Sequence, residues 1–178
     1  TGRPLSFKYR ALGEPLLGIL MGPTMVMGSY YVQTRGWDWV VFVLSLAFAM
    51  IVASISLVNN LRDLPDDQAA GIRTLPMVLG VARTKKLYYL LTAGPFALAL
   101  ASIVANPAFW PLAAVFAALP RARVAINVLR DTADDVRDIR LKALARPYPL
   151  YSIRLHARFG ALAVFGLVVA GLLPLASL

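Results

Sequence analysis

The sequence predicts an all-α membrane protein with five transmembrane helices. Of its 178 residues, 59% are hydrophobic and only 15% are charged. The mean hydropathy of +0.68 is above the range of ordinary soluble domains. The charged residues gather in short segments between long apolar runs. Because a helix needs about 20 apolar residues to cross the hydrocarbon core, these runs predict one membrane domain, residues 1–178, with five spans.

The composition also excludes several kinds of site. The chain contains no cysteine, so it has no disulfide, thiol nucleophile or thiolate metal site. Its net charge of +9 could suggest nucleic acid, but the basic residues lie between the apolar runs. We therefore expect membrane lipid and anionic substrates as partners, and no nucleic acid.

The first two spans are predicted at about 15–33 and 39–58. The first follows a polar segment, 2–14, and contains three glycines that would let neighbouring helices approach closely: Gly18, Gly22 and Gly28. A turn with two tryptophans, which suit the membrane interface, joins it to the second.

The remaining spans are predicted at about 87–105, 108–129 and 159–178. The apolar part of the fourth, 108–119, is too short to cross the membrane as an α-helix. We therefore extend this span to Leu129, with Arg121 and Arg123 reaching toward the interface. The charged segment 131–158 is expected to be a surface helix or loop.

The distribution of Lys and Arg predicts the orientation. Counting Arg121 and Arg123, which reach toward that interface from the fourth span, seventeen of the 18 basic residues lie toward one side, and Arg35 alone lies on the other side. The positive-inside rule then predicts a multi-pass protein of the cell (inner) membrane. Its N-terminus and the segment 59–75 would be cytoplasmic, and its C-terminus would be outside.

A candidate metal site lies in 59–75, directly after the second span. Asp63 and Asp67 are four residues apart, so on a helical turn they project from one face and can share a cation. Magnesium is typically held by one or two carboxylates together with the phosphates of a substrate. Asp63 and Asp67 are therefore the predicted magnesium ligands and catalytic residues, and Asp66 is more simply explained as a helix-start residue.

Several neighbouring side chains suit an anionic substrate. Arg62 and Arg73 flank the aspartates, and guanidinium groups bind phosphate oxygens through two parallel hydrogen bonds. Asn59 and Asn60 could donate to a phosphate or only cap the second span. Lys8 and Tyr9 could contact the substrate from the N-terminal segment. The simpler alternative for the whole stretch is a solvated loop in which acids balance arginines.

A second acidic cluster at 127–135 partly repeats the first. Its aspartates, Asp131, Asp134 and Asp135, could form a second metal-binding wall through an internal duplication. The glycine, arginine and Thr-Leu that follow the first cluster are absent here. The alternating Arg and Asp residues are instead typical of a surface helix with i,i+4 salt bridges.

The residues at 59–75, Asn-Asn-Leu-Arg-Asp-x3-Asp-x3-Gly-x-Arg-Thr-Leu, resemble the second aspartate-rich motif of the UbiA-type membrane prenyltransferases. The segments 1–14 and 28–34, the latter including Tyr-Tyr-Val-Gln-Thr, are similar to the branch that prenylates 1,4-dihydroxy-2-naphthoate in menaquinone biosynthesis. Two departures stand out. Ile72 replaces the usual lysine of the family, and no stretch before Asp63 can serve as its first acidic motif.

The resemblance implies both a fold and a chemistry. The five spans would correspond to helices five to nine of a nine-helix bundle, so the chain is expected to be the C-terminal half of the enzyme. Magnesium on Asp63 and Asp67 would assist departure of the diphosphate from a polyprenyl diphosphate. An aromatic carboxylate acceptor then bonds to the allylic carbon, and in the naphthoate branch carbon dioxide leaves.

Two other functions remain open from the sequence. One is a non-catalytic membrane module, such as a transporter half or a degenerate paralogue, whose acids bind a cation or balance arginines. The other is a prenyltransferase of another UbiA-type branch. The segments 59–60 and 30–34 favour the naphthoate branch.

Overall fold

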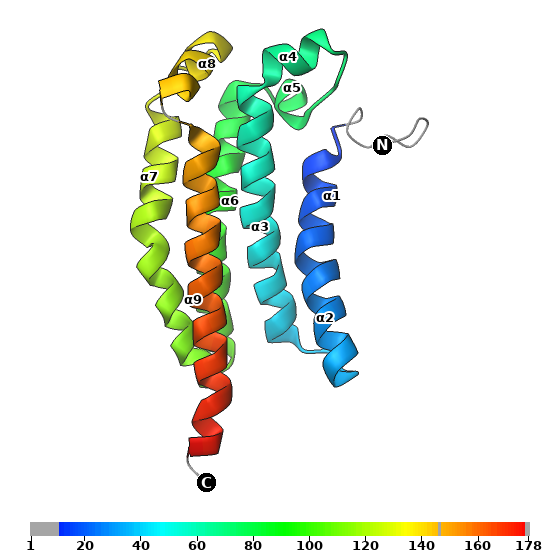
Figure 1. Cartoon of the computed structure of the whole chain (residues 1–178), viewed down its shortest axis with the longest axis vertical. Coiled ribbons are helices and arrows are strands. Elements are labelled where there is room, and N and C mark those ends of the chain that lie inside the picture. The colour runs from blue at the N-terminus through cyan, green and yellow to red at the C-terminus, as the bar shows by residue number, and fades with distance from the viewer. Residues whose placement is uncertain (1–10, 146, 177–178) are drawn as a thin grey trace.

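The computed structural model describes residues 11–145 and 147–176, and every regular element in these ranges is a helix. The elements in order are α1 (Gly13–Ile19), η2 (Leu20–Thr24), α2 (Met25–Thr34), α3 (Trp39–Arg62), α4 (Leu64–Ala69), α5 (Leu75–Leu79), α6 (Val81–Ala105), η3 (Pro107–Ala118), α7 (Leu119–Arg130), α8 (Val136–Ala145) and α9 (Tyr148–Ala176). Figure 1 shows long helices running side by side, with α4, α5 and α8 gathered at one end. We call this end the cap end.

Four helical segments in the described residues are long and apolar enough to cross a membrane. They are Trp39–Arg62, Val81–Ala105, Pro107–Arg130 and Tyr148–Leu172. The chain is thus a membrane protein with several apolar helices, as the composition predicts. Residues 13–34 form a further helical rod beside α3 (Figure 1), but this rod is not among the four, so the fifth span stays a prediction.

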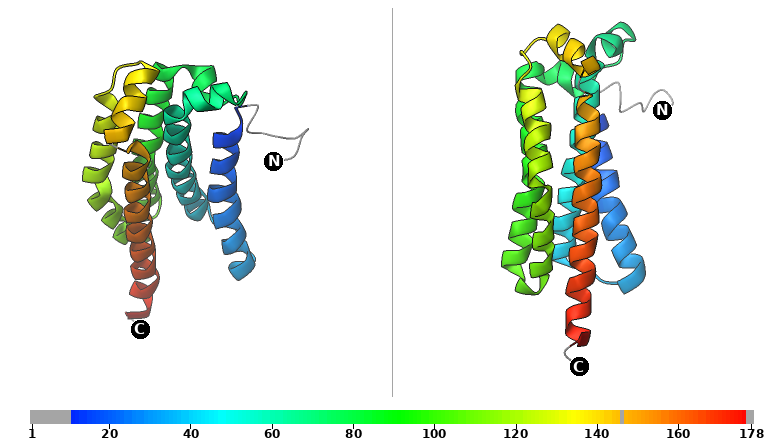
Figure 2. Two further views of the ribbon diagram at one scale, coloured as in Figure 1. Left: turned by 45° about the horizontal axis from the view of Figure 1, so that its top comes forward. Right: turned by 60° about the vertical axis from the view of Figure 1, so that its left-hand side comes forward.

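Helix α3 holds the bundle together. Its start is fixed by Asp38, whose side chain accepts hydrogen bonds from the backbone N–H groups of Val40 (2.7 Å) and Val41 (3.0 Å). α3 packs against α1 and η2 on one side and against α6 and α9 on the other. The left view of Figure 2 shows the rod of α1 and α2 beside α3 and apart from the other long helices.

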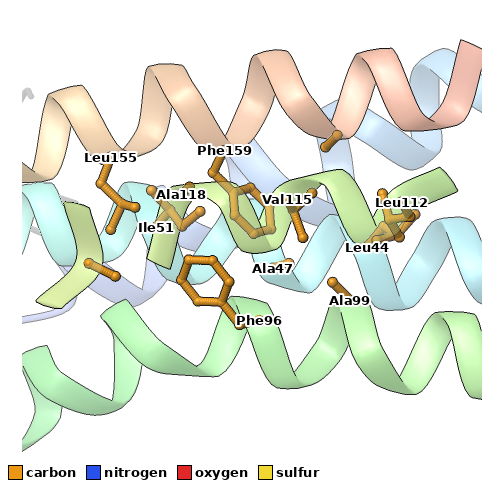
Figure 3. Packing of buried hydrophobic residues seen from close by; sticks show 12 residues of the cluster. Leu44, Ala47, Ile51, Phe96, Ala99, Leu112, Val115, Ala118, Leu155 and Phe159 are labelled. Atoms are coloured by element: carbon orange, nitrogen blue, oxygen red, sulfur yellow. The ribbon is translucent and has the colours of Figure 1, made fainter. Parts of the chain in front are cut away.

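The main core lies between α3, α6, η3 and α9 (Figure 3). Phe159 of α9 is fully buried and meets the ring of Phe96 edge to face, with 5.4 Å between the ring centroids. Leu44 and Ile51 of α3 fill the same cluster. This packing fixes the relative positions of the helices that lead to the cap end.

The fourth span is not an α-helix throughout, because η3 is a 3-10 helix of 12 residues. A 3-10 helix rises about 2.0 Å per residue, so η3 covers roughly 24 Å instead of the ~18 Å of an α-helix. Its fully buried residues follow the 3-10 period of three: Leu112, Val115 and Ala118. The apolar part of this span is too short to cross the membrane as an α-helix, and its 3-10 geometry makes up part of the missing length.

Two glycines allow close helix contacts. A Cβ atom at Gly22 of η2 would lie 2.6 Å from the Ser45 carbonyl oxygen of α3, and one at Gly166 of α9 would lie 2.7 Å from the Pro111 carbonyl oxygen. η2 is a π-helical turn around Pro23, which cannot donate the hydrogen bond that a regular α-helix requires. Gly28 was also expected to allow a close helix contact. A Cβ atom added there would meet no described atom of a neighbouring helix within 4 Å, so Gly28 makes no such contact in the described part of the chain.

The helices extend further into the cap end than the apolar runs indicate. α6 begins at Val81 instead of 87, and α9 begins at Tyr148 instead of 159. Ser152 lies in the added part of α9, and its hydroxyl group forms a buried hydrogen bond of 2.7 Å with that of Tyr88 in α6. A second cluster, which includes Leu61, Leu129 and Ile139, packs α8 onto the ends of the long helices. Tertiary packing thus continues these helices beyond the membrane-length runs.

Candidate functional site

The aspartate stretch lies at the cap end, where α3 gives way to α4. Asp63 is the residue between the two helices, and Asp66 and Asp67 stand in the first turn of α4. The turn after α4 closes when the Ile72 N–H donates to the Asp67 carbonyl at 2.9 Å. Gly71 adopts a positive φ of 67°, which glycine accepts without strain. The chain then reverses toward α5.

Asp63 and Asp67 are separated by one helical turn, as their spacing predicts. The Asp67 N–H donates to the Asp63 carbonyl at 2.9 Å, and both residues are partly buried. Two carboxylates on one turn match what magnesium takes from a protein, with the remaining positions left to phosphate and water. The described residues contain no cluster of three or more potential metal ligands. The Asp63 and Asp67 carboxylates are the oxygen donors here that would suit magnesium together with a phosphate.

The Asp63 carboxylate is held by its neighbour. Arg62 Nε donates to Asp63 Oδ1 at 2.6 Å, and Arg62 Nη2 donates to Asp63 Oδ2 at 2.7 Å. Such a two-pronged pair fixes the carboxylate plane. Arg62 was predicted to contact the substrate. In the structure its guanidinium group is instead paired with the Asp63 carboxylate.

The aspartate stretch borders a cleft of about 370 Å³ between the end of α3, α4 and α8. Arg62 and Asp63 line it together with Asp66, and Arg140 of α8 closes the other side. The Arg140 Nη1 atom lies 3.3 Å from Asp66 Oδ1. Asp66 thus joins α4 to α8, a role that the sequence could not indicate because Arg140 is remote along the chain.

The two asparagines lie on the last turn of α3. Asn60 Nδ2 donates to Glu14 Oε1 at 2.8 Å, and Glu14 is 3% exposed. The Asn59 carbonyl accepts from the Asp63 N–H at 2.9 Å. Asn60 therefore ties α3 to α1. Glu14, assigned from the sequence to a polar entry segment, is a buried part of α1.

The other predicted substrate contacts lie around the N-terminal segment. Arg73 has an exposed side chain in the turn between α4 and α5, and its carbonyl accepts from the Ala11 N–H at 3.0 Å. This contact brings residue 11 against the aspartate stretch. Lys8 and Tyr9 lie outside the described residues.

An apolar groove of about 330 Å³ opens between α1, α3, α5 and α6. Glu14 lines it near the cap end, and Leu75, which follows Arg73 and Thr74, lines it as well. Gly18, which has no side chain, and the small Ala53 also line it. The groove is thus linked to the aspartate stretch through the Asn60–Glu14 hydrogen bond and through Leu75.

The second acidic cluster is engaged in structural contacts. Asp134 Oδ1 accepts from the buried Lys85 Nζ at 2.8 Å, and the same amine donates to the Thr132 carbonyl at 2.9 Å. Asp138 pairs with Lys142 at 2.9 Å across one turn of α8. The Lys142 hydrogen bond, followed by one from the Ala133 N–H, lowers the pKa of the Asp138 carboxyl. This i,i+4 pair lies in α8, outside 127–135. Asp131, Asp134 and Asp135 lie in the turn between α7 and α8, so the second cluster itself is not the salt-bridged surface helix that the sequence predicted.

Asp131 and Asp135 of the second cluster take part in this packing through their backbone carbonyl groups. The Asp131 carbonyl accepts from Lys142 Nζ at 2.9 Å, and the Asp135 carbonyl accepts from the Ile139 N–H at 3.1 Å. Both carboxylates are exposed. The sequence did not predict that Lys85 is buried, because its partners Thr132 and Asp134 lie in the turn after α7, far along the chain.

Comparison with known proteins gives consistent matches. The model of the UbiA prenyltransferase family matches residues 4–145. A 1,4-dihydroxy-2-naphthoate octaprenyltransferase from Mycobacterium tuberculosis is 34% identical over 144 residues, which are 74% of this chain and 49% of that protein. The protein of the same name from Bacillus subtilis is 36% identical over 80 residues, covering 45% of this chain and 26% of its own length.

A human relative, UbiA prenyltransferase domain-containing protein 1, is 30% identical over 172 residues, which are 96% of this chain and 47% of that protein. The chain therefore spans about half the length, or less, of these relatives. No solved structure matches the chain.

Proposed function

Because the chain belongs to the UbiA prenyltransferase family, we propose that it takes part in transferring a polyprenyl group from its diphosphate to an aromatic acceptor. The acceptor we propose is 1,4-dihydroxy-2-naphthoate, as in menaquinone biosynthesis. The names of the bacterial relatives support this choice. The observation that carries the proposal is that Asp63 and Asp67 lie one turn apart at the cap end, while Leu75 of the same stretch lines the apolar groove.

Each part of the site suits one part of a polyprenyl diphosphate. The Asp63 and Asp67 carboxylates would hold magnesium, which when bound neutralises charge on a departing diphosphate. Arg73 has an exposed guanidinium in the following turn, suited to phosphate oxygens. The groove lined by Gly18 and Leu75 offers an apolar surface to the isoprenoid chain.

Arg62 has a positioning role in this scheme. Its two hydrogen bonds hold the Asp63 carboxylate in one plane, so the carboxylate does not have to be ordered when the substrate binds. In the transfer itself, the allylic carbon–oxygen bond breaks and its electron pair leaves with the diphosphate. A ring carbon of the acceptor bonds to the allylic carbon, and its carboxyl group leaves as carbon dioxide.

We also propose that a second acidic motif comes from another part of the same polypeptide, since the matched part of this chain covers only 49% and 47% of two relatives. That part would supply the opposite wall of the site. The cap end would face the cytoplasm of the cell membrane, from which both substrates arrive. Seventeen of the 18 basic residues favour this orientation.

The test is prenyl transfer by the full-length protein in nanodiscs, with a polyprenyl diphosphate, dihydroxynaphthoate and magnesium. Asp63→Asn or Asp67→Asn should lower turnover by roughly a thousandfold, because each removes charge at the reacting diphosphate. Chelation should abolish the activity of the unmodified protein, and added magnesium should restore it.

The matched control is Asp131→Asn, which makes the same change in an exposed carboxylate of the second cluster. It should stay within a few-fold of the unmodified rate. Near-normal turnover by Asp67→Asn would remove it from the site. An equal loss in Asp131→Asn would instead assign the second cluster to catalysis.

A further inference from the structure

A second charged cavity lies away from the aspartate stretch, between α7 and α9. It has a volume of about 310 Å³, and three arginines line it: Arg121 from α7, with Arg154 and Arg158 from α9. The same three side chains border an adjoining surface hollow of about 530 Å³. We call the two together the basic groove. α7 and α9 pack against one another, so the groove is formed by neighbouring helices.

The positive charge of the basic groove is not compensated within the described part of the chain. None of the three arginines forms an ion pair there, whereas Arg62 and Arg140 at the cap end each contact an aspartate. Arg154 and Arg158 are also four residues apart on one face of α9, where like charges repel. Three converging cations without a carboxylate favour an anionic ligand.

The depth of the groove matches the phosphates of a bilayer leaflet. Arg158 is the last charged residue of α9, and the described helix continues without charge to Ala176. On the other wall, η3 carries no charge and covers roughly 24 Å before Arg121 is reached. Since the hydrocarbon core is about 30 Å thick, the arginines fall at its boundary.

The face of α9 below the arginines is apolar and exposed. Starting from Arg154 and Arg158, steps of three and four residues lead along the same face to residues that are all exposed: Ala161, Phe165, Val168 and Leu172. Inside the groove, Val124 and Pro120 add apolar surface next to the cations. This combination of cations at the leaflet boundary and an apolar strip beneath fits a ligand with a phosphate head and hydrocarbon tails.

We propose that the basic groove binds the phosphate of an anionic phospholipid such as phosphatidylglycerol, with acyl chains along the apolar face of α9. Basic pockets between transmembrane helices are suited to anionic headgroups, and each cation near the surface adds to the attraction. Arg121 contacts the lipid from α7, while Arg154 and Arg158 contact it from α9. The bound lipid would join the two helices at the leaflet boundary.

The experiment is native mass spectrometry of the full-length protein titrated with dioleoyl phosphatidylglycerol or dioleoyl phosphatidylcholine. The triple variant Arg121→Gln, Arg154→Gln, Arg158→Gln should bind phosphatidylglycerol at least about tenfold more weakly, with phosphatidylcholine binding unchanged. The matched control removes three exposed arginines outside the groove: Arg83→Gln, Arg123→Gln and Arg137→Gln. Its affinity should stay within about twofold, although its net charge falls by the same amount.

The single variants Arg154→Gln and Arg158→Gln are measured beside the triple variant, so that a folding defect in the latter cannot decide the result. Each should weaken phosphatidylglycerol binding by a few-fold. Unchanged binding in the singles and the triple would overturn the proposal, as would an equal loss in the triple and its matched control.

A second titration, with a polyprenyl diphosphate in the absence of magnesium, tests whether the basic groove binds a phospholipid or a prenyl diphosphate. If this ligand displaces phosphatidylglycerol and loses affinity in the triple variant, the groove is a prenyl diphosphate site and the phospholipid assignment is wrong. Prenyl transfer is not part of either readout, so failure here leaves the proposed reaction untouched.

Discussion

At the scale of single residues, the contact between Asn60 and Glu14 connects the aspartate stretch to the apolar groove. The two side chains are 46 positions apart and share a hydrogen bond of 2.8 Å, with Glu14 almost fully buried. A buried polar group that loses its partner costs more free energy than an exposed one. This bond therefore contributes to where α1 lies against α3.

Glu14→Ala should lower the free energy of unfolding by about 1–3 kcal/mol, because it leaves the partly buried Asn60 amide without this acceptor. Glu14→Gln keeps a carbonyl acceptor at the same place and should cost less. Thermal unfolding of the protein in detergent, followed by tryptophan fluorescence, measures both. Equal midpoints for the two variants would show that the hydrogen bond contributes nothing.

The candidate site could be predicted only in part from such residues. The spacing of Asp63 and Asp67 indicated one helical turn, and a backbone hydrogen bond joins them across that turn. Arg140 and Glu14 gave no signal, because their partners Asp66 and Asn60 are brought near by tertiary packing. Patterns of local spacing describe single turns, and they carry no information on which distant elements meet.

At the scale of elements, the rod of α1, η2 and α2 depends on one close approach to α3. At Gly22, an added Cβ would lie 2.5 Å from the Ala49 Cβ and 2.9 Å from the Ala49 Cα. Since backbone atoms of α3 are among the obstacles, side-chain rotation cannot relieve the clash. A glycine at this position thus lets the rod approach α3 closely.

Gly22→Ala should destabilise the protein by about 1–3 kcal/mol, as expected when a packed contact is overfilled. Gly28→Ala, in the same rod, has no described atom within 4 Å of the added Cβ and serves as the matched control. It should be neutral or slightly stabilising, because alanine is the better helix former. The midpoints of thermal unfolding compare the two, and a greater loss in Gly28→Ala would contradict the packing described for α3.

The sequence predicted the long spans better than their helix types. Uncharged runs of membrane length located most of α3, α6 and α9, because hydropathy depends on composition alone. The residues of η3 and η2 would also be compatible with an α-helix. Their 3-10 and π geometries depend on packing against neighbouring helices, which the sequence does not show. For the same reason, the apolar runs did not mark where α6 and α9 begin.

At the scale of the whole molecule, the structure separates the basic residues along the bundle. Arg73 and Lys142 belong to the cap end, whereas Arg35 lies at the far end of α2 (Figure 1). This separation matches the distribution from which the orientation was predicted. It also allows that orientation to be measured directly.

Cysteines introduced at Arg35, Arg73 and Lys142 of the cysteine-free chain should differ in labelling by an impermeant thiol reagent on intact cells. Position 35 should react, while positions 73 and 142 should react only after the cells are lysed, since the positive-inside rule keeps the cap end inside. Labelling of position 73 but not position 35 would reverse the topology.

The mixed helix type of the fourth span gives it a length that its residue count does not fix. Rewinding Pro107–Ala118 from the 3-10 to the α form would shorten the segment by about 6 Å. An ordinary helix meets hydrophobic mismatch in a thinner bilayer by tilting, and we expect this one to respond by a change of pitch as well. Such a change would move Arg121 along the membrane normal relative to Arg158, so we expect the spacing of these two cations to depend on bilayer thickness.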